Sequence, residues 1–195
     1  MKKILLIFII ITEIAFSNTK IITRALVNNL PITDIDIINE IKIINILNNE
    51  VKLDNNLKTM AIQNLINDIL KDEEINKNKI KIDEDIIKKN YNAFLEEIAK
   101  KNINIENNLK KIIYNKIKLE NSWKSLVANK FSWKVNININ EINKIIEEYS
   151  KKNNDEIKIS EYREKLILIE KNKKMEVYEN NYLKLLRKNA IIKIF

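Results

Sequence analysis

The chain has 195 residues, 45% of them hydrophobic and 32% charged, with a net charge of +8, one Pro and no Gly, His or Cys. These proportions are typical of a globular chain that buries one core. The missing residue types exclude glycine-rich phosphate loops, histidine bases and cysteine thiolates, so we expect no enzymatic activity and no bound cofactor or metal. The lysines alternate with Glu and Asp, which favours solvated helix faces over a nucleic-acid partner.

Residues 1–17 have the layout of a secretory signal peptide. A basic start, an apolar run and two small residues follow one another: Lys2 and Lys3, Ile4 to Ile11, and Ala15 and Ser17. The run is far shorter than the roughly 20 residues that span a bilayer. We therefore predict cleavage between Ser17 and Asn18, a periplasmic location, and a processed chain that does not span the membrane.

The mature chain begins with a β-branched segment, Ile21 to Asn28, which predicts one short strand followed by a turn. Asn28 and Asn29 are expected to take the left-handed backbone conformation that Gly usually supplies. Thr33, with Asp36 three residues later, is typical of a capping box and predicts the start of a helix that continues to Leu47.

Three further helices are predicted from apolar residues that recur every three or four positions. They run from Leu57 to Glu74, from Asp83 until Asn102 and Asn104 close the helix, and from Ile105 to Phe131. The last has the longest stripe: Leu109, Ile112, Ile113, Ile117, Trp123, Leu126, Val127 and Phe131. A stripe of this width needs partners on several sides, so this helix is expected at the centre of the fold.

The remaining third of the chain predicts shorter elements. In order they are an extended connector at 132–140, a short helix capped by Asn140, a linker at 151–156, helices at 159–171 and 175–188, and a strand at 190–195. The two strands, 21–28 and 190–195, should pair, because each would otherwise leave its backbone groups without partners. The fold class is therefore mainly α with one small two-stranded β pairing. We expect a single domain, 18–195, in which 157–195 packs back onto 18–150.

Several segments resemble the SurA family of periplasmic chaperones. The segments that resemble the N-terminal domain of this family are the export signal, VNN (27–29), ITDIDI (32–37), LKTMAIQNLINDIL (57–70), KIDEDII (81–87), FLEEIAKKN (94–102) and the long helix. Residues 162–195 look like the family's C-terminal helix and final strand. The resemblance implies a chaperone whose two ends form one core module. The parvulin-type isomerase domain of most members is missing at about the 151–156 linker, and isomerase activity is not implied.

The leading functional hypothesis is an ATP-independent periplasmic holdase that binds unfolded outer-membrane proteins and passes them to the outer-membrane assembly machinery. Burying a few hundred Å² of apolar surface, at roughly 25 cal/mol per Å², supports weak and reversible binding after the cost of association. Candidate client-binding residues are the aromatic side chains outside a clean core stripe: Phe131, Trp133, Tyr149 and Tyr162. Ordinary packing is the alternative at each position.

A structural or adaptor subunit that docks on one fixed periplasmic or membrane-assembly partner is the alternative function. A fixed interface would concentrate exposed apolar side chains in one patch, whereas a chaperone would spread them along a groove.

Two carboxylate clusters, 72–74 and 83–85, could in principle serve acid–base chemistry or bind a hard cation. Both lie near predicted helix ends, so we expect them to be solvated.

Overall fold

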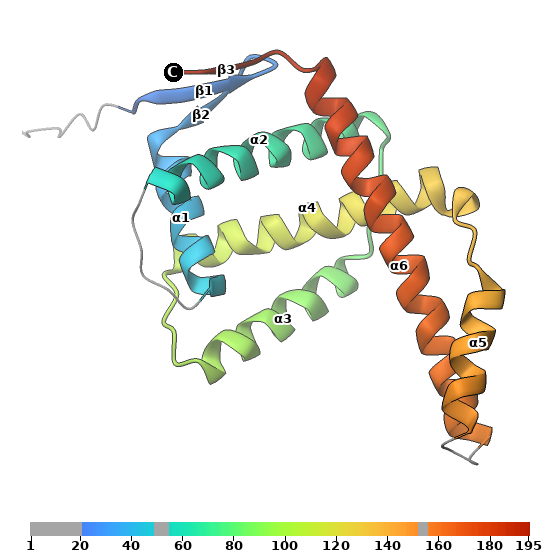
Figure 1. The fold of residues 1–195 in the computed structure, drawn as a ribbon. Coiled ribbons are helices and arrows are strands. Elements are labelled where there is room, and N and C mark those ends of the chain that lie inside the picture. Colours follow the sequence, from blue (N-terminus) through green and yellow to red (C-terminus); the bar gives the residue numbers. More distant parts are fainter. Residues whose placement is uncertain (1–20, 49–54, 152–155) are drawn as a thin grey trace, which may run out of the picture.

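Six α-helices and a small sheet form the part of the chain that the computed structural model describes, residues 21–48, 55–151 and 156–195 (Figure 1). The elements are β1 (Thr23–Val27), β2 (Leu30–Thr33), α1 (Asp34–Asn48), α2 (Asn55–Lys77), α3 (Glu84–Lys100), α4 (Asn107–Phe131), the 3-10 helix η1 (Ser132–Lys134), α5 (Ile139–Ser150), α6 (Glu156–Asn189) and β3 (Ile192–Ile194). The mainly α fold class with a small β pairing is confirmed. The predicted signal peptide and its cleavage position, and residues 152–155 of the predicted linker, lie outside the described residues.

The two strands predicted at 21–28 and 190–195 pair as predicted. In the antiparallel sheet, of order β2-β1-β3, Ala25 faces Ile194 and Val27 faces Ile192. The sheet has one strand more than expected, because the chain turns back on itself directly after β1. Asn28 and Asn29 have φ angles of 46° and 74°, the left-handed pair that a two-residue hairpin requires. Pro31 fits into β2 because β2 is an edge strand.

Asn28 also fastens the C-terminal end of the chain to the sheet. Its backbone N–H donates to the Ile191 carbonyl at 3.0 Å, and its side-chain oxygen accepts from the Ile191 N–H at 2.9 Å. Its amide nitrogen donates to a carboxylate oxygen of Glu73 at 2.7 Å. One turn residue therefore connects the β-hairpin, the start of β3 and α2.

Local capping signals place the first and third helices where the sequence predicts them. The Thr33 N–H donates to the Asp36 carboxylate at 2.8 Å, and the Asp36 N–H donates to the Thr33 hydroxyl at 3.3 Å, which completes the capping box of α1. Asp83 caps α3 by accepting from the Asp85 N–H at 2.9 Å. The chain leaves α3 through Asn102, whose φ of 55° is left-handed.

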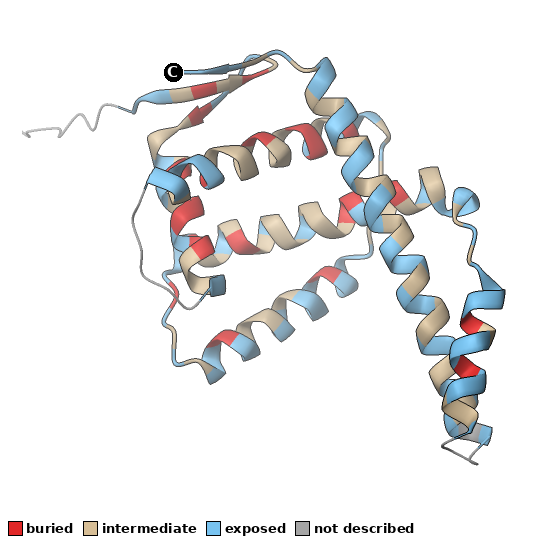
Figure 2. Ribbon diagram, viewed as in Figure 1, coloured by how far each residue is buried: buried red, intermediate tan, exposed pale blue. Residues whose placement is uncertain are grey.

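The helix α4 lies at the centre of the helical body and contacts α1, α2, α3 and α6. Three groups of buried side chains hold this body together (Figure 2). The first joins the sheet to α1 and α2, the second joins α1, α3 and α4, and the third joins α2 to α4. In that order their buried members are Ala25, Val27, Ile32, Ile37, Ile41, Ile44, Ala61, Ile66 and Leu70; Ile43, Ile98, Ile105, Leu109 and Ile113; and Ile75, Trp123, Leu126 and Val127. Half-buried residues of α6 cover the third group.

The helix α6 runs without interruption through 172–174, so the predicted division into helices at 159–171 and 175–188 is wrong. The apolar pattern breaks there because the helix exchanges one packing partner for another: α5 lies along its first half, and α2 and α4 along its second. Neither Gly nor Pro occurs in this region, so the backbone has no reason to leave the helical conformation.

The helix α5 and the first half of α6 pack together and project from the body; we name this hairpin the arm (Figure 1). Ile142 and Ile146 are its buried α5 residues. Arg163 donates to the Asn143 side-chain oxygen at 2.7 Å, and the rings of Tyr149 and Tyr162 lie 4.3 Å apart. Because α6 is continuous, the position of the arm depends on how α6 is held in the body.

The segment expected to be extended, 132–140, departs from that prediction at both ends. Its first three residues form η1, only 135–138 lack regular structure, and α5 already begins at Ile139. The cap is Asn138 rather than Asn140, since the Asn138 side chain accepts from the Glu141 N–H at 3.4 Å. The alternating apolar residues here have no neighbouring strand to pair with, and the local cap decides the conformation.

Replacing Trp123 by Ala should lower the free energy of unfolding by about 3–5 kcal/mol, since its indole is fully buried in the third group. The matched change Trp133→Ala removes an indole that is 76% exposed, and should cost no more than about 0.5 kcal/mol. Urea unfolding followed by circular dichroism measures both. Equal losses for the two variants would contradict the assigned core.

Candidate functional site

An aromatic stack holds α6 where it crosses α4. Trp123 of α4 and Tyr182 of α6 lie parallel, with ring centroids 5.6 Å apart and an interplanar angle of 3°. Phe131, at the end of α4, stacks on Tyr178 at 5.5 Å and meets Tyr182 edge-on at 5.3 Å. Aromatic pairs of this kind add to the energy of burial and favour particular ring orientations. They fix α6 along the last two turns of α4.

A buried carboxylate, Glu74 of α2, completes this joint between α6 and the body. It accepts from the Tyr182 hydroxyl at 2.5 Å and from the Asn78 amide at 2.7 Å, and the Lys130 ammonium lies 3.4 Å away. Burial alone would raise the pKa of Glu74, but the hydrogen bonds from Tyr182, Asn78 and Lys130 outweigh it and hold the pKa below its ordinary value of 4.5. Burial and the bond to Glu74 raise the pKa of Tyr182. Glu74 therefore joins α2, α4 and α6 as a charged group.

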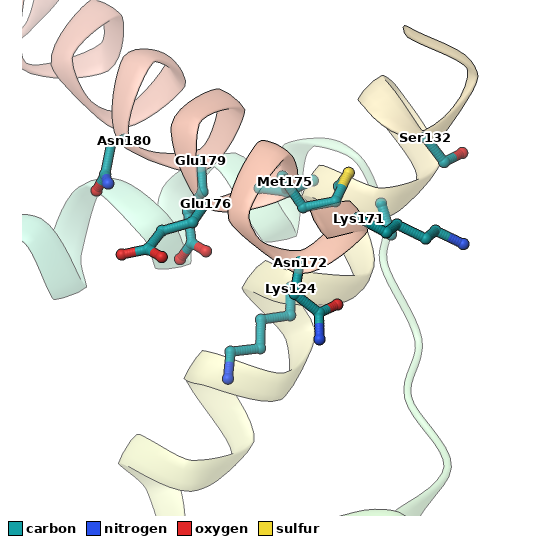
Figure 3. A pocket seen from close by; sticks show the side chains of 10 residues that line it. Lys124, Ser132, Lys171, Asn172, Met175, Glu176, Glu179 and Asn180 are labelled. Carbon is teal, nitrogen blue, oxygen red and sulfur yellow. The ribbon is translucent and has the colours of Figure 1, made fainter. Parts of the chain in front are cut away.

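Where α6 crosses α4 the two helices border a hollow of about 660 Å³, which we name the arm hollow (Figure 3). Figure 3 shows the Lys124 side chain of α4 near Asn172 and Met175 of α6. The other lining residues are Val127 and Ala128 of α4, Ser132 of η1, and Lys171, Glu176, Glu179 and Asn180 of α6. The hollow thus combines an apolar base with charged and amide side chains of both helices.

A second hollow, of about 380 Å³, lies between α1, α3 and α4, and we name it the body hollow. Its apolar lining comes from Ile43, Leu47, Phe94, Ile113 and Ile117, and its polar lining from Glu40, Asn90, Lys116, Glu120, Asn121 and Lys124. Leu47 is 55% exposed and forms part of the mouth. An apolar floor inside a polar rim is the usual composition of a binding pocket.

Lys124 borders both hollows. Five of the α4 residues that line them follow one another at spacings of three and four: Ile113, Ile117, Asn121, Lys124 and Ala128. Such spacings place side chains on one face of a helix. We name the two hollows together the α4 groove. The sequence pattern showed the apolar stripe of this helix but contained no sign that part of it, with Asn121 and Lys124 beside it, borders two hollows.

A cluster of charged side chains lies behind the body hollow, between α1, α2 and α4. Lys116 contacts the carboxylates of Glu40, at 2.7 Å, and Asp68, while Lys71 contacts Glu120 at 2.5 Å. Burial alone would lower the pKa of Lys116, but the two carboxylates outweigh it and raise the pKa. Burial raises the pKa of Asp68 despite the neighbouring ammonium group. Lys116 thus stays protonated and serves as a structural ion-pair partner rather than as a nucleophile.

The four predicted client-binding residues lie at two separate places, and none of them lines the α4 groove. Phe131 is half-buried in the aromatic stack, and Tyr149 and Tyr162 pair with each other inside the arm. Trp133 alone of the four is exposed, immediately after the groove residue Ser132. Their role in binding clients stays a prediction.

The two carboxylate clusters differ from each other in their surroundings. The cluster at 83–85 lies at a solvated helix start as predicted, where Glu84 binds the Lys118 ammonium at 2.7 Å and the Tyr114 hydroxyl at 2.8 Å. In the cluster at 72–74 the prediction is wrong for Glu74, which is buried because α6 covers it. Among the described residues no group of three or more acidic side chains is placed to hold a metal ion.

Within the described ranges, the helices are all too short or too polar to cross a lipid bilayer. Neither a protein-family model nor a curated protein matches the sequence. The resemblance to the SurA family therefore rests on the sequence segments and the order of elements alone, and stays a prediction.

Replacing Tyr182 by Phe should lower the free energy of unfolding by about 1.5–3 kcal/mol at neutral pH, because a hydrogen bond to a buried charge is lost. A carboxyl group whose pKa is lowered by folding stabilises the protein above its ordinary pKa, here 4.5, and this contribution disappears as the pH falls through the lower folded value. The deficit of the variant should therefore shrink below pH 4.5. Urea unfolding at a series of pH values measures it.

Tyr178→Phe is the matched control, since the Tyr178 hydroxyl donates to the Lys134 carbonyl at 3.3 Å instead of to a carboxylate. Its smaller deficit should not change over the same pH range. A deficit of Tyr182→Phe that is independent of pH would show that Glu74 is not the group this hydroxyl stabilises.

Proposed function

We propose that the chain is an ATP-independent chaperone that holds unfolded proteins in the α4 groove. The observation that carries the proposal is that both hollows lie along one face of α4 and share Lys124 as a lining residue. On the resemblance to the SurA family, the clients would be outer-membrane proteins in transit through the periplasm, and isomerase activity would be absent.

The length of the groove fits an extended segment of polypeptide. From Ile113 to the end of α4 at Phe131 the helix axis rises about 27 Å, at about 1.5 Å per residue. An extended chain rises about 3.3 Å per residue, so about eight client residues would span the groove. Client segments of this length are abundant in any unfolded protein, which is what a chaperone with many clients needs.

The lining of the groove supports binding without strict sequence preference. The body hollow offers aliphatic and aromatic side chains, including Phe94 and Leu47, and the arm hollow offers Met175, whose flexible thioether adapts to different shapes. Burying a few hundred Å² of apolar surface at roughly 25 cal/mol per Å² offsets the cost of ordering an extended chain by a small margin. Binding would thus be weak enough for release without a nucleotide.

The alternative function, an adaptor for one fixed partner, has a single observation in its favour. The C-terminal end of the chain leaves three large apolar side chains exposed, with Ile191 at 65%, Ile194 at 55% and Phe195 at 70%. They lie on and beside the edge strand β3, and an edge strand is a common place for protein–protein pairing. A folded chain that cannot prevent aggregation of clients would favour this alternative.

Leu47→Glu should weaken client binding about fivefold to tenfold, because it places a charge in the mouth of the body hollow. Ile38→Glu is the matched control: Ile38 lies on the same helix, is 54% exposed against 55% for Leu47, and does not line the groove. Nine residues separate the two, which places them on opposite faces of α1. Light scattering of an unfolded outer-membrane β-barrel protein diluted from urea, at several chaperone ratios, measures the effect.

The unchanged chain should suppress the scattering at near-stoichiometric amounts, Ile38→Glu should do so equally well, and Leu47→Glu should need a clear excess. Equal loss in both variants, with both folded by circular dichroism, would rule out the α4 groove as the binding site. Absence of suppression by the unchanged chain would rule out the holdase function itself.

A further inference from the structure

The turn between α4 and α5 presents a tryptophan to solvent. We name this region the elbow; it comprises η1 and the two lysines of α6 beside it, Lys171 and Lys174. Trp133 is 76% exposed, whereas Trp123, the other tryptophan of the chain, is fully buried. Trp is among the most apolar side chains, and an exposed indole is a common anchor of binding surfaces.

The exposed indole is held in place by its neighbours. Its Nε1–H donates to the Lys130 carbonyl at 2.9 Å, and the Lys134 ammonium lies 4.9 Å from the ring centroid. The Tyr178 hydroxyl donates to the Lys134 carbonyl at 3.3 Å, which ties η1 to α6. A side chain that is already ordered loses little conformational entropy on binding, so the elbow presents Trp133 in a conformation suited to a partner.

The turn that carries Trp133 contains lysine and no carboxylate, whereas the adjoining arm hollow is also lined by Glu176 and Glu179. Between Glu120 and Glu141 the sequence contains no Asp or Glu, and Lys174 of α6 donates to the Asn136 carbonyl beside the turn. Lys171 lines the arm hollow together with Ser132. Within the described part of the chain, Lys134, Lys171 and Lys174 have no carboxylate within salt-bridge distance. Lys130 and Lys173 differ, since each has an acidic partner, Glu74 and Glu170.

We propose that the elbow docks the protein on the surface of an anionic phospholipid bilayer. An indole prefers the boundary between headgroups and acyl chains, where its ring is buried and its N–H meets polar groups. Lysines beside it contact anionic headgroups, and each strengthens binding by about fivefold near such a surface. Ile139, 45% exposed at the start of α5, adds apolar surface next to the turn. The elbow shares Ser132 and Lys171 with the arm hollow, whereas Trp133, Lys134 and Lys174 do not line the α4 groove.

The test uses the chain without residues 1–17 and two kinds of vesicle, pure phosphatidylcholine and an equal mixture of phosphatidylcholine and phosphatidylglycerol. Co-sedimentation measures binding. Tryptophan fluorescence reports on the elbow, because Trp123 is buried already and only Trp133 can leave water. The anionic vesicles should bind the protein, shift its emission to shorter wavelength and protect it from acrylamide quenching, and 0.5 M salt should reverse all three effects.

Trp133→Ala should weaken binding about tenfold, and Lys134→Glu combined with Lys171→Glu should weaken it at least twentyfold. Lys184→Glu together with Lys188→Glu is the control with the same change of net charge; both lysines are exposed on α6, away from the elbow, and binding should fall no more than about threefold. Circular dichroism checks that all variants are folded.

Equal binding to both kinds of vesicle, or equal losses for the elbow and control lysine pairs, would overturn the proposal. So would binding to anionic vesicles without a change in emission, because Trp133 would then remain in water. Binding to heparin or DNA without binding to anionic vesicles would assign the elbow to a soluble polyanion instead.

Discussion

The joint at which α6 crosses α4 is the contact on which the rest of the structure depends. There the indole of Trp123, the ring of Tyr182 and the buried carboxylate of Glu74 meet, and three helices share one set of contacts. The joint fixes the direction of the arm, since α6 is one continuous helix. It also brings the end of the chain to the sheet, where β3 pairs with β1.

The polar groups at this joint and in the charge cluster have related physical roles. Glu74 and Lys116 are each surrounded by oppositely charged or hydrogen-bonding groups, because a charge removed from water is stable only when paired. Their partners come from different helices, so each group stabilises one particular arrangement of those helices. Lys116 lines the body hollow, and Val127 and Met175 of the third group line the arm hollow, so each hollow has part of its wall in the packed body. A groove of this kind suits a chaperone that binds clients without a nucleotide-driven change of shape.

Local patterns in the sequence predicted what local physics controls. Thr33 with Asp36, Asp83 and Asn102 marked helix ends because their side chains or backbone conformations act within a few residues. The pairing of the two terminal strands was also predictable, since a lone strand must find a partner. The extra strand β2 was missed because Pro31 lacks a backbone N–H and is compatible only with an edge strand. The sequence does not show which strand lies at an edge. The predicted division of α6 was wrong because the apolar pattern breaks at 172–174, where the helix changes its packing partner, and such a break in the sequence resembles the end of a helix.

The sequence by itself determined the mainly α class, the central position of α4 and the pairing of the first and last predicted strands, because a wide apolar stripe needs to be covered and a lone strand needs a partner. Only the tertiary structure decided which side chains remain uncovered. Periodicity shows where a helix is apolar, but whether the polar positions beside the apolar stripe, such as Asn121 and Lys124, are covered depends on how distant helices cross them. The same reason explains Glu74 and Trp133: the crossing of α6 buried one, and the turn after α4 left the other in solvent.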